Sequence, residues 1–215
     1  PLAGLQGDGV PPALRVGELH LLALSERAAL RMCGHNPAGY PRGYARLMGE
    51  GGLRFHVAGF PVSVPLGGIL GVLLIAYLWT PNFTEPGRSG IVLAVVFAVL
   101  LYAGVLVHEL AHAWAARAFG YPVHGITLWL LGGYTVYERR SSRPWPELMI
   151  AVIGPVSTLV LAGLCWVLAE ATSGSTSLLL GALAWTNGLL GVLNLLPGAP
   201  LDGGGVVKSL VWRVS

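Results

Sequence analysis

The stretch IVLAVVFAVLLYAGVLVHELAH, residues 91–112, joins a long apolar run to three ionisable side chains at its end. No charged residue precedes His108 in this run, which as a helix is long enough to cross about 30 Å of hydrocarbon. His108, Glu109 and His112 close it. Burying an ionisable group in lipid costs about 2.5–3.5 kcal/mol on insertion scales, so such groups at this depth indicate a functional site.

The spacing of the two histidines points to a metal. Residues four apart lie on the same side of a helix, about 6 Å apart along its axis. The pattern His-Glu-x-x-His is typical of zinc sites in which both imidazoles bind the ion and the glutamate between them accepts a proton. A helix end with three structurally partnered polar residues would give the same letters. The apolar setting favours the other interpretation, hydrolysis within a membrane or at its edge.

The composition is that of an integral membrane protein. The chain is 54% hydrophobic and 11% charged, with a mean hydropathy of +0.67, whereas soluble domains carry about 25% charged residues. We therefore expect a lipid bilayer around it. The net charge of +3 is small, and no basic stripe with interleaved aromatic residues occurs, so we expect no nucleic-acid partner. Two cysteines offer no disulfide framework.

Four apolar segments approach the roughly 20 residues that a transmembrane helix needs. We place them at about 62–79, 90–119, 148–169 and 178–196, and expect a further helix from about Asp202. The predicted fold class is an all-α polytopic membrane protein with at least four transmembrane helices.

The basic residues predict an orientation. Of the 13 Lys and Arg residues, all except Arg88 lie before the first span, at the end of the second span or between the second and third, or after the fourth. The positive-inside rule then places both termini of this multi-pass cell-membrane protein in the cytoplasm. We expect residues 1–54 to form a cytoplasmic leader, in which a helix over 13–32 and an unstructured segment fit equally well. Residues 55–215 form the transmembrane core, and we expect the natural chain to continue beyond Ser215.

The segment 125–137 carries a hairpin pattern. Residues 126–131 are apolar and β-prone, Gly132 and Gly133 interrupt them, and a second β-prone run follows. Strands cannot face lipid with unpaired backbone groups, so we expect a small β-hairpin at the membrane edge between spans two and three. Its free edge could bind an extended substrate segment by strand addition, although a simple connector is equally compatible. The residues predicted to pair with substrate are Trp129, Leu130, Leu131, Gly132 and Gly133.

A catalytic zinc takes three protein ligands and keeps one open position. Beyond the two histidines, the candidates for the third ligand are His124, Glu138, Glu147, Glu170 and Asp202. Asp202 alone lies in a broken helix, because residues 194–205 contain two prolines and four glycines. Irregular backbone at membrane depth is tolerated where it lines a site. An aspartate at a helix start could also be only a cap, but its depth matches that of the histidines.

Both motifs together resemble the site-2 protease family of intramembrane zinc metalloproteases. The resemblance rests on His108–His112 in span two and on the stretch at span four that contains Asn194, Pro197 and Leu201-Asp202-Gly203, and it covers about residues 55–213. It implies that His108, His112 and Asp202 bind one Zn²⁺ per chain, that Glu109 is the catalytic base, and that Asn194 positions the substrate or the oxyanion.

The resemblance also implies an activity. The family hydrolyses a peptide bond in or near a transmembrane segment, as in regulated intramembrane proteolysis. The expected substrate is a single-span membrane protein such as an anti-sigma factor or another membrane-tethered regulator. Gly154-Pro155 fits the family pattern, whereas Thr158 stands where many relatives have asparagine or serine.

The short distance between the motifs leaves no room for a PDZ insertion. The chain is therefore more similar to the compact branch, whose members often carry CBS domains after the core. Two alternatives stay open at this stage. A zinc-binding membrane transporter would have several metal sites along a path, with no special need for Glu109. An inactive, protease-like scaffold would lack part of the His, Glu, His and Asp set.

Overall fold

The computed structural model describes residues 52–84, 90–130, 132–138, 144–198 and 201–214. The chain divides into two units, and every described residue belongs to the second, Gly49–Ser215. Nearly all of the predicted leader, including the candidate helix over 13–32, lies outside the described residues.

Four helical segments are long and apolar enough to cross a membrane. They are α3 (Leu66–Trp79) with the short η2 (Thr80–Phe83), then α4 (Ile91–Ala118), α5 (Pro144–Glu170) and α6 (Gly174–Asn194). The prediction of a mostly helical polytopic membrane protein is confirmed. Many large apolar side chains of these helices are exposed, which suits a lipid environment. A further helix, α7 (Asp202–Val214), begins at the predicted aspartate.

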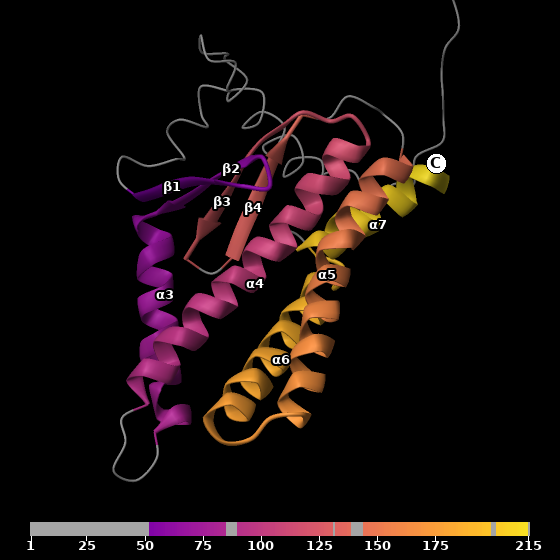
Figure 1. Ribbon diagram of the computed structural model, residues 1–215. Coiled ribbons are helices and arrows are strands. Elements are labelled where there is room, and N and C mark those ends of the chain that lie inside the picture. Colours follow the sequence, from indigo (N-terminus) through magenta and orange to yellow (C-terminus); the bar gives the residue numbers. More distant parts are fainter. Residues whose placement is uncertain (1–51, 85–89, 131, 139–143, 199–200, 215) are drawn as a thin grey trace, which may run out of the picture. The chain divides into compact units, whose positions relative to one another are not determined.

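Helices α4 and α5 are the centre of the helical packing. Helix α4 contacts α3 on one side and α5 on another, while α6 and α7 both pack against α5 (Figure 1). Pro155 lies inside α5 and lacks the amide proton that a helix interior uses, so the hydrogen-bond ladder is interrupted there. This interruption lies close to the histidines of α4, as the contacts below show.

A four-stranded sheet accompanies the helices. Its order is β1 (Gly52–Val57), β2 (Phe60–Pro65), β3 (Val123–Trp129) and β4 (Gly132–Tyr137). β1 and β2 form a hairpin whose turn residues, Ala58 and Gly59, have φ values of 52° and 79°. β2 runs parallel to β3, and β3 pairs antiparallel with β4. The predicted hairpin is therefore half of a larger sheet, with β4 at one edge.

Two boundaries differ from the sequence prediction. The first span begins at Leu66 and not near residue 62, because Val62 and Ser63 pair with β3. A short apolar run is compatible with a strand or a helix, and only the partner from the distant β3 decides between them. Gly132 and Gly133 do not form the turn: they begin β4, opposite Trp129 and Leu128.

The sheet is fixed to α4. Phe60, Val62 and Ile126 of the sheet form a buried cluster with residues of α4 that include Tyr102. The Tyr102 hydroxyl donates to the backbone carbonyls of Leu130 and Trp129, at 2.7 and 3.0 Å, at the tip of the β3–β4 hairpin. These contacts hold β4 alongside the part of α4 that carries Glu109.

Candidate metal centre and active site

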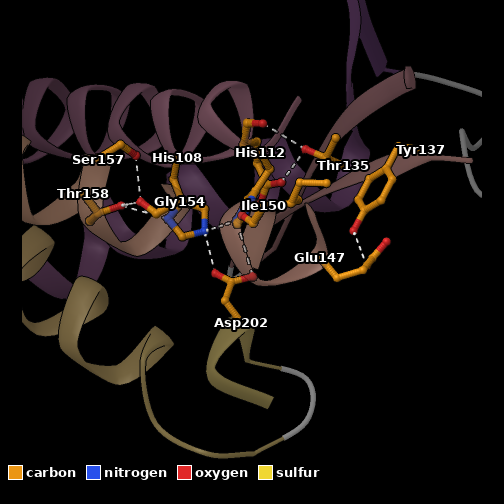
Figure 2. A network of polar contacts seen from close by, with 11 residues as sticks. His108, His112, Thr135, Tyr137, Glu147, Ile150, Gly154, Ser157, Thr158 and Asp202 are labelled. Atoms are coloured by element: carbon orange, nitrogen blue, oxygen red, sulfur yellow. Dashed lines mark hydrogen bonds and ion pairs between the residues drawn. The ribbon is translucent and has the colours of Figure 1, made fainter. Parts of the chain in front are cut away.

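The two histidines of α4 and the aspartate of α7 converge on one point (Figure 2). Nε2 of His108 lies 3.0 Å from Nε2 of His112. The Asp202 carboxylate completes the group, with Oδ2 at 3.0 Å from His108 Nε2 and Oδ1 at 3.3 Å from His112 Nε2. Both imidazoles are buried. The structure thus brings together all three residues predicted to bind the metal.

The other ring nitrogens fix the tautomers. His112 Nδ1 donates to the carbonyl oxygen of Ile150 at 2.7 Å, and a carbonyl can only accept. His108 Nδ1 lies 2.8 Å from Oγ1 of Thr158, whose own proton goes to the Gly154 carbonyl at 3.2 Å. Thr158 therefore accepts from His108. With a proton on each Nδ1, both neutral imidazoles direct an Nε2 lone pair at the same point.

Three acceptor groups this close form a site that could hold a cation. Two imidazole nitrogens and a carboxylate are a common zinc donor set, and ligand atoms about 2 Å from a tetrahedral ion lie about 3.3 Å apart. The observed separations fit zinc.

A glycine of α5 makes room for this centre. A Cβ atom on Gly154 would overlap Nε2 of His112 and would stand only 2.9 Å from Cε1 of His108. The adjacent Pro155 interrupts the helix ladder, and Ile150 and Thr158 on the same helix bind the two imidazoles. The Gly154-Pro155 pair seen in the sequence therefore lies against the metal centre.

Glu109 lies on another side of the same helical turn, against strand β4. Its carboxylate Oε2 accepts a hydrogen bond from the Thr135 hydroxyl at 2.7 Å, and its backbone carbonyl lies 3.0 Å from the same hydroxyl. A Cβ atom on Gly133 would lie 2.7 Å from Cγ of Glu109, so only glycine leaves room there. Sequence reasoning missed Thr135. The alternation of Gly133 and Thr135 along a strand is the signal that could have found it.

A cavity of about 290 Å³, lined by both polar and apolar side chains, reaches this group. It is lined by Glu109, His112 and Asp202, by residues of β4, and by Glu147, Lys208 and Ser209 of α5 and α7. Tyr137 of β4 donates to Glu147 at 3.5 Å (Figure 2). Glu109, His112 and Asp202 therefore border one common space.

Other predicted residues lie further from the centre. Asn194 is partly exposed in the last turn of α6, and among the described residues its side chain makes no hydrogen bond. Trp129 lies beside Gly67 of α3, while Gly132 and Gly133 belong to the edge strand β4. Leu130 is in the hairpin turn, and Leu131 lies outside the described residues. Of the other candidates for the third ligand, His124 lies near Glu138, 3.9 Å away, and not at the centre.

Two buried histidines and a partly buried aspartate meet beside a glutamate, and the histidines and the glutamate lie on a helix that can cross a membrane. These features define the class of membrane metallopeptidases. Comparison with known proteins agrees. The sequence model of peptidase family M50 matches residues 96–178 and 169–215, and the chain belongs to this family.

Individual relatives support the assignment. Rip3 of Mycobacterium tuberculosis is 40% identical over 170 residues, which are 74% of this chain and 43% of that protein. A relative from Synechocystis sp. is 40% identical over 133 residues, covering 60% of this chain and 35% of its own length. The names of both place them among the zinc metalloproteases. The solved site-2 protease from Methanocaldococcus jannaschii superposes with a TM-score of 0.60 at 25% identity, covering 75% of this chain and 72% of that one.

The chain thus spans less than half of the length of these two relatives. Its fold is of the site-2 protease type. Within the described ranges, His108, His112 and Asp202 are the only group of potential ligands close enough to share an ion. A transporter path would need several such groups.

Proposed function

We propose that this chain is an intramembrane zinc metalloprotease that hydrolyses a peptide bond in or near the transmembrane segment of a membrane protein. The observation that carries the proposal is the convergence of the two Nε2 atoms of His108 and His112 and the Asp202 carboxylate beside Glu109. The two histidines and Glu109 lie on α4, which can cross a bilayer. His108, His112 and Asp202 would hold one zinc ion, and the cavity lined by Glu109, His112 and Asp202 would give water access to it.

Each residue has a separable role in this proposal. Zinc, when bound, supplies Lewis-acid activation of water and of the scissile carbonyl. Glu109 accepts the proton of the attacking water and returns it to the leaving amine. Asn194 is proposed to assist the substrate or the oxyanion, because it precedes the loop that leads to Asp202. Ile150 and Thr158 keep the two imidazoles in the tautomer that binds metal.

The substrate must reach the site in an extended form, because a helical peptide bond is shielded by its own hydrogen bonds. β4 is the edge strand of the sheet and lines the cavity, so we propose that the substrate adds to it as a further strand. Gly132 and Gly133 lie on this edge strand. Trp129 of β3, Leu130 and Leu131 are proposed to help bind the added substrate strand.

The expected substrates are single-span membrane proteins, such as an anti-sigma factor or another membrane-tethered regulator, cleaved in regulated intramembrane proteolysis. The distribution of basic residues supports cytoplasmic termini. Labelling of cysteines introduced at each terminus, from each side of sealed vesicles, measures this orientation. Labelling of both termini from the outer side of right-side-out vesicles would show that the termini are not cytoplasmic.

The decisive experiment combines metal analysis with cleavage. The chain is reconstituted in liposomes with a single-span test protein whose segment contains a Gly-Pro break. We expect one zinc per chain and a new product in the wild type. Glu109→Gln should keep the zinc and lower cleavage by about 100- to 10,000-fold, because it removes the proton acceptor. Asp202→Ala should weaken zinc binding.

The alternatives give different outcomes in the same vesicles. Zinc uptake by the wild type, undiminished in Glu109→Gln, would support a transporter. Zinc binding without cleavage of any member of a panel of single-span proteins would support an inactive scaffold. Cleavage by Glu109→Gln at the wild-type rate would refute the assigned role of this residue.

A further inference from the structure

We propose that Thr135 is a positioning residue for Glu109, so that the strand proposed to bind the substrate also orients the catalytic base. This inference rests on the proposed function and adds to it a residue that the sequence motifs do not include. Thr135 belongs to β4, far from the His-Glu-x-x-His motif in the sequence, and reaches Glu109 only through the fold.

The Thr135 hydroxyl contacts both the side chain and the backbone of Glu109. The Thr135 hydroxyl lies 2.7 Å from Oε2 of Glu109 and 3.0 Å from the backbone carbonyl of Glu109. The shorter bond runs to a charged acceptor when the carboxylate is ionised, and such bonds are the stronger ones. A side chain held at its carboxylate by a group that also contacts its own backbone has few rotamers left.

The second carboxylate oxygen, Oε1, lies against Gly133 of the same strand, where a Cβ atom would stand 2.9 Å from it. Among the described residues, no hydrogen bond uses Oε1 of Glu109, which lines the cavity together with His112 and Asp202. With Oε2 held by Thr135, Oε1 is the atom that accepts the proton of the attacking water. When that proton has arrived, the Thr135 hydroxyl keeps an acceptor, because the Glu109 carbonyl lies within reach.

The geometry of the strand explains why this contact belongs to substrate binding. Side chains two residues apart point to the same face of a strand. Gly133 and Thr135 both face Glu109, the first by leaving space and the second by donating a hydrogen bond. A peptide added to the free edge of β4 would be in register with the strand that sets the base. The same strand, β4, would then position both the scissile peptide bond and the Glu109 carboxylate that accepts the proton.

The test separates the hydroxyl from the shape of the side chain. Thr135→Val keeps the β-branched shape and removes the hydroxyl, and Thr135→Ser keeps the hydroxyl. Thr127→Val is the matched control, because Thr127 is a buried threonine of β3 whose hydroxyl pairs with Ser63 and does not touch Glu109. All variants are assayed as the full chain in liposomes, with the test protein described above.

We expect Thr135→Val to lower kcat about 10- to 100-fold, the effect of losing a hydrogen bond to a charged group, with unchanged KM and zinc content. Thr135→Ser should recover most of the rate. Thr127→Val should lower the thermal midpoint and leave kcat per zinc near that of the wild type.

A binding measurement gives a readout that does not depend on turnover. A short peptidyl hydroxamate binds zinc and shares its proton with the neighbouring carboxylate. Thr135→Val should weaken its binding about 10-fold in the wild-type background and not at all in Glu109→Gln. Equal weakening in both backgrounds would show that Thr135 does not act through Glu109.

The outcomes distinguish this inference from the proposed function. If the wild type binds no zinc and cleaves nothing, the proposed function fails. If the wild type is active and Thr135→Val keeps full kcat, or Thr135→Ser is as impaired as Thr135→Val, the positioning role alone is wrong. If Thr135→Val loses zinc, Thr135→Ala is measured in its place, and zinc loss there too would make Thr135 a structural residue.

Discussion

The two sides of a single turn of α4 are built differently. His108 and His112 face α5 and α7, where Thr158, Ile150 and Asp202 bind them. Glu109, one residue away and rotated by about 100° around the helix axis, faces strand β4. One side therefore depends on helix packing, and the other side depends on the sheet.

This difference indicates that metal binding and proton transfer have separate supports. The partners of the imidazoles orient their lone pairs, whereas on the other side Thr135 donates to Oε2 of Glu109 and Gly133 leaves space for Oε1. No residue among these contacts serves both sides. Substitutions on the α5 side should change zinc affinity, and substitutions on the β4 side should change the rate at full zinc content.

The largest effect is expected on the α5 side. In Gly154→Ala the added methyl group overlaps the His112 ring, so the two imidazoles and the aspartate cannot converge. We expect zinc affinity, measured by competition with a chelator, to fall by more than the roughly 100-fold typical of changes that affect only a ligand's partners. Gly163→Ala is the control in the same helix, because its methyl group would meet nothing within 4 Å. Full zinc content in Gly154→Ala would show that the close packing of α5 against the histidines is not needed for zinc binding.

The matching change on the sheet side is Gly133→Ala. Its methyl group would stand 2.7 Å from Cγ of Glu109 and must displace the carboxylate. A displacement of about 1 Å costs about 100-fold in rate, so we expect that loss in kcat with zinc retained. Gly132→Ala, whose methyl group meets nothing within 4 Å, should lose much less. A loss of zinc in Gly133→Ala would show that the two sides are coupled.

A smaller effect is expected for Thr158→Val, which removes the acceptor of the His108 Nδ1 proton. Without it the imidazole can rotate or change tautomer, and zinc affinity should fall about 10-fold. Thr158→Ser should restore it. Ser157→Ala serves as the neighbouring control, because that hydroxyl donates to the Gly154 carbonyl and does not contact a histidine. Equal zinc affinities in Thr158→Val and Ser157→Ala would show that Thr158 does not support zinc binding through the His108 tautomer.

The helices of this fold follow from local sequence. The run from Ile91 to the histidines has helical length and no charge, and helix periodicity alone puts His108 and His112 on one side. α7 begins at Asp202, where glycines and prolines had indicated a new helix. The strand Phe60–Pro65 was not predicted, because its identity depends on pairing with β3.

The sequence by itself determined a membrane-embedded helix with two imidazoles and a glutamate in reach of one ion, because these features depend only on neighbours along the chain. It also nominated Asp202 through its unusual setting. Tertiary structure alone brought that carboxylate to the imidazoles, aimed their lone pairs through Ile150 and Thr158, and placed Thr135 on Glu109. Such contacts join residues from different elements, and only the packing of those elements decides which side chains meet.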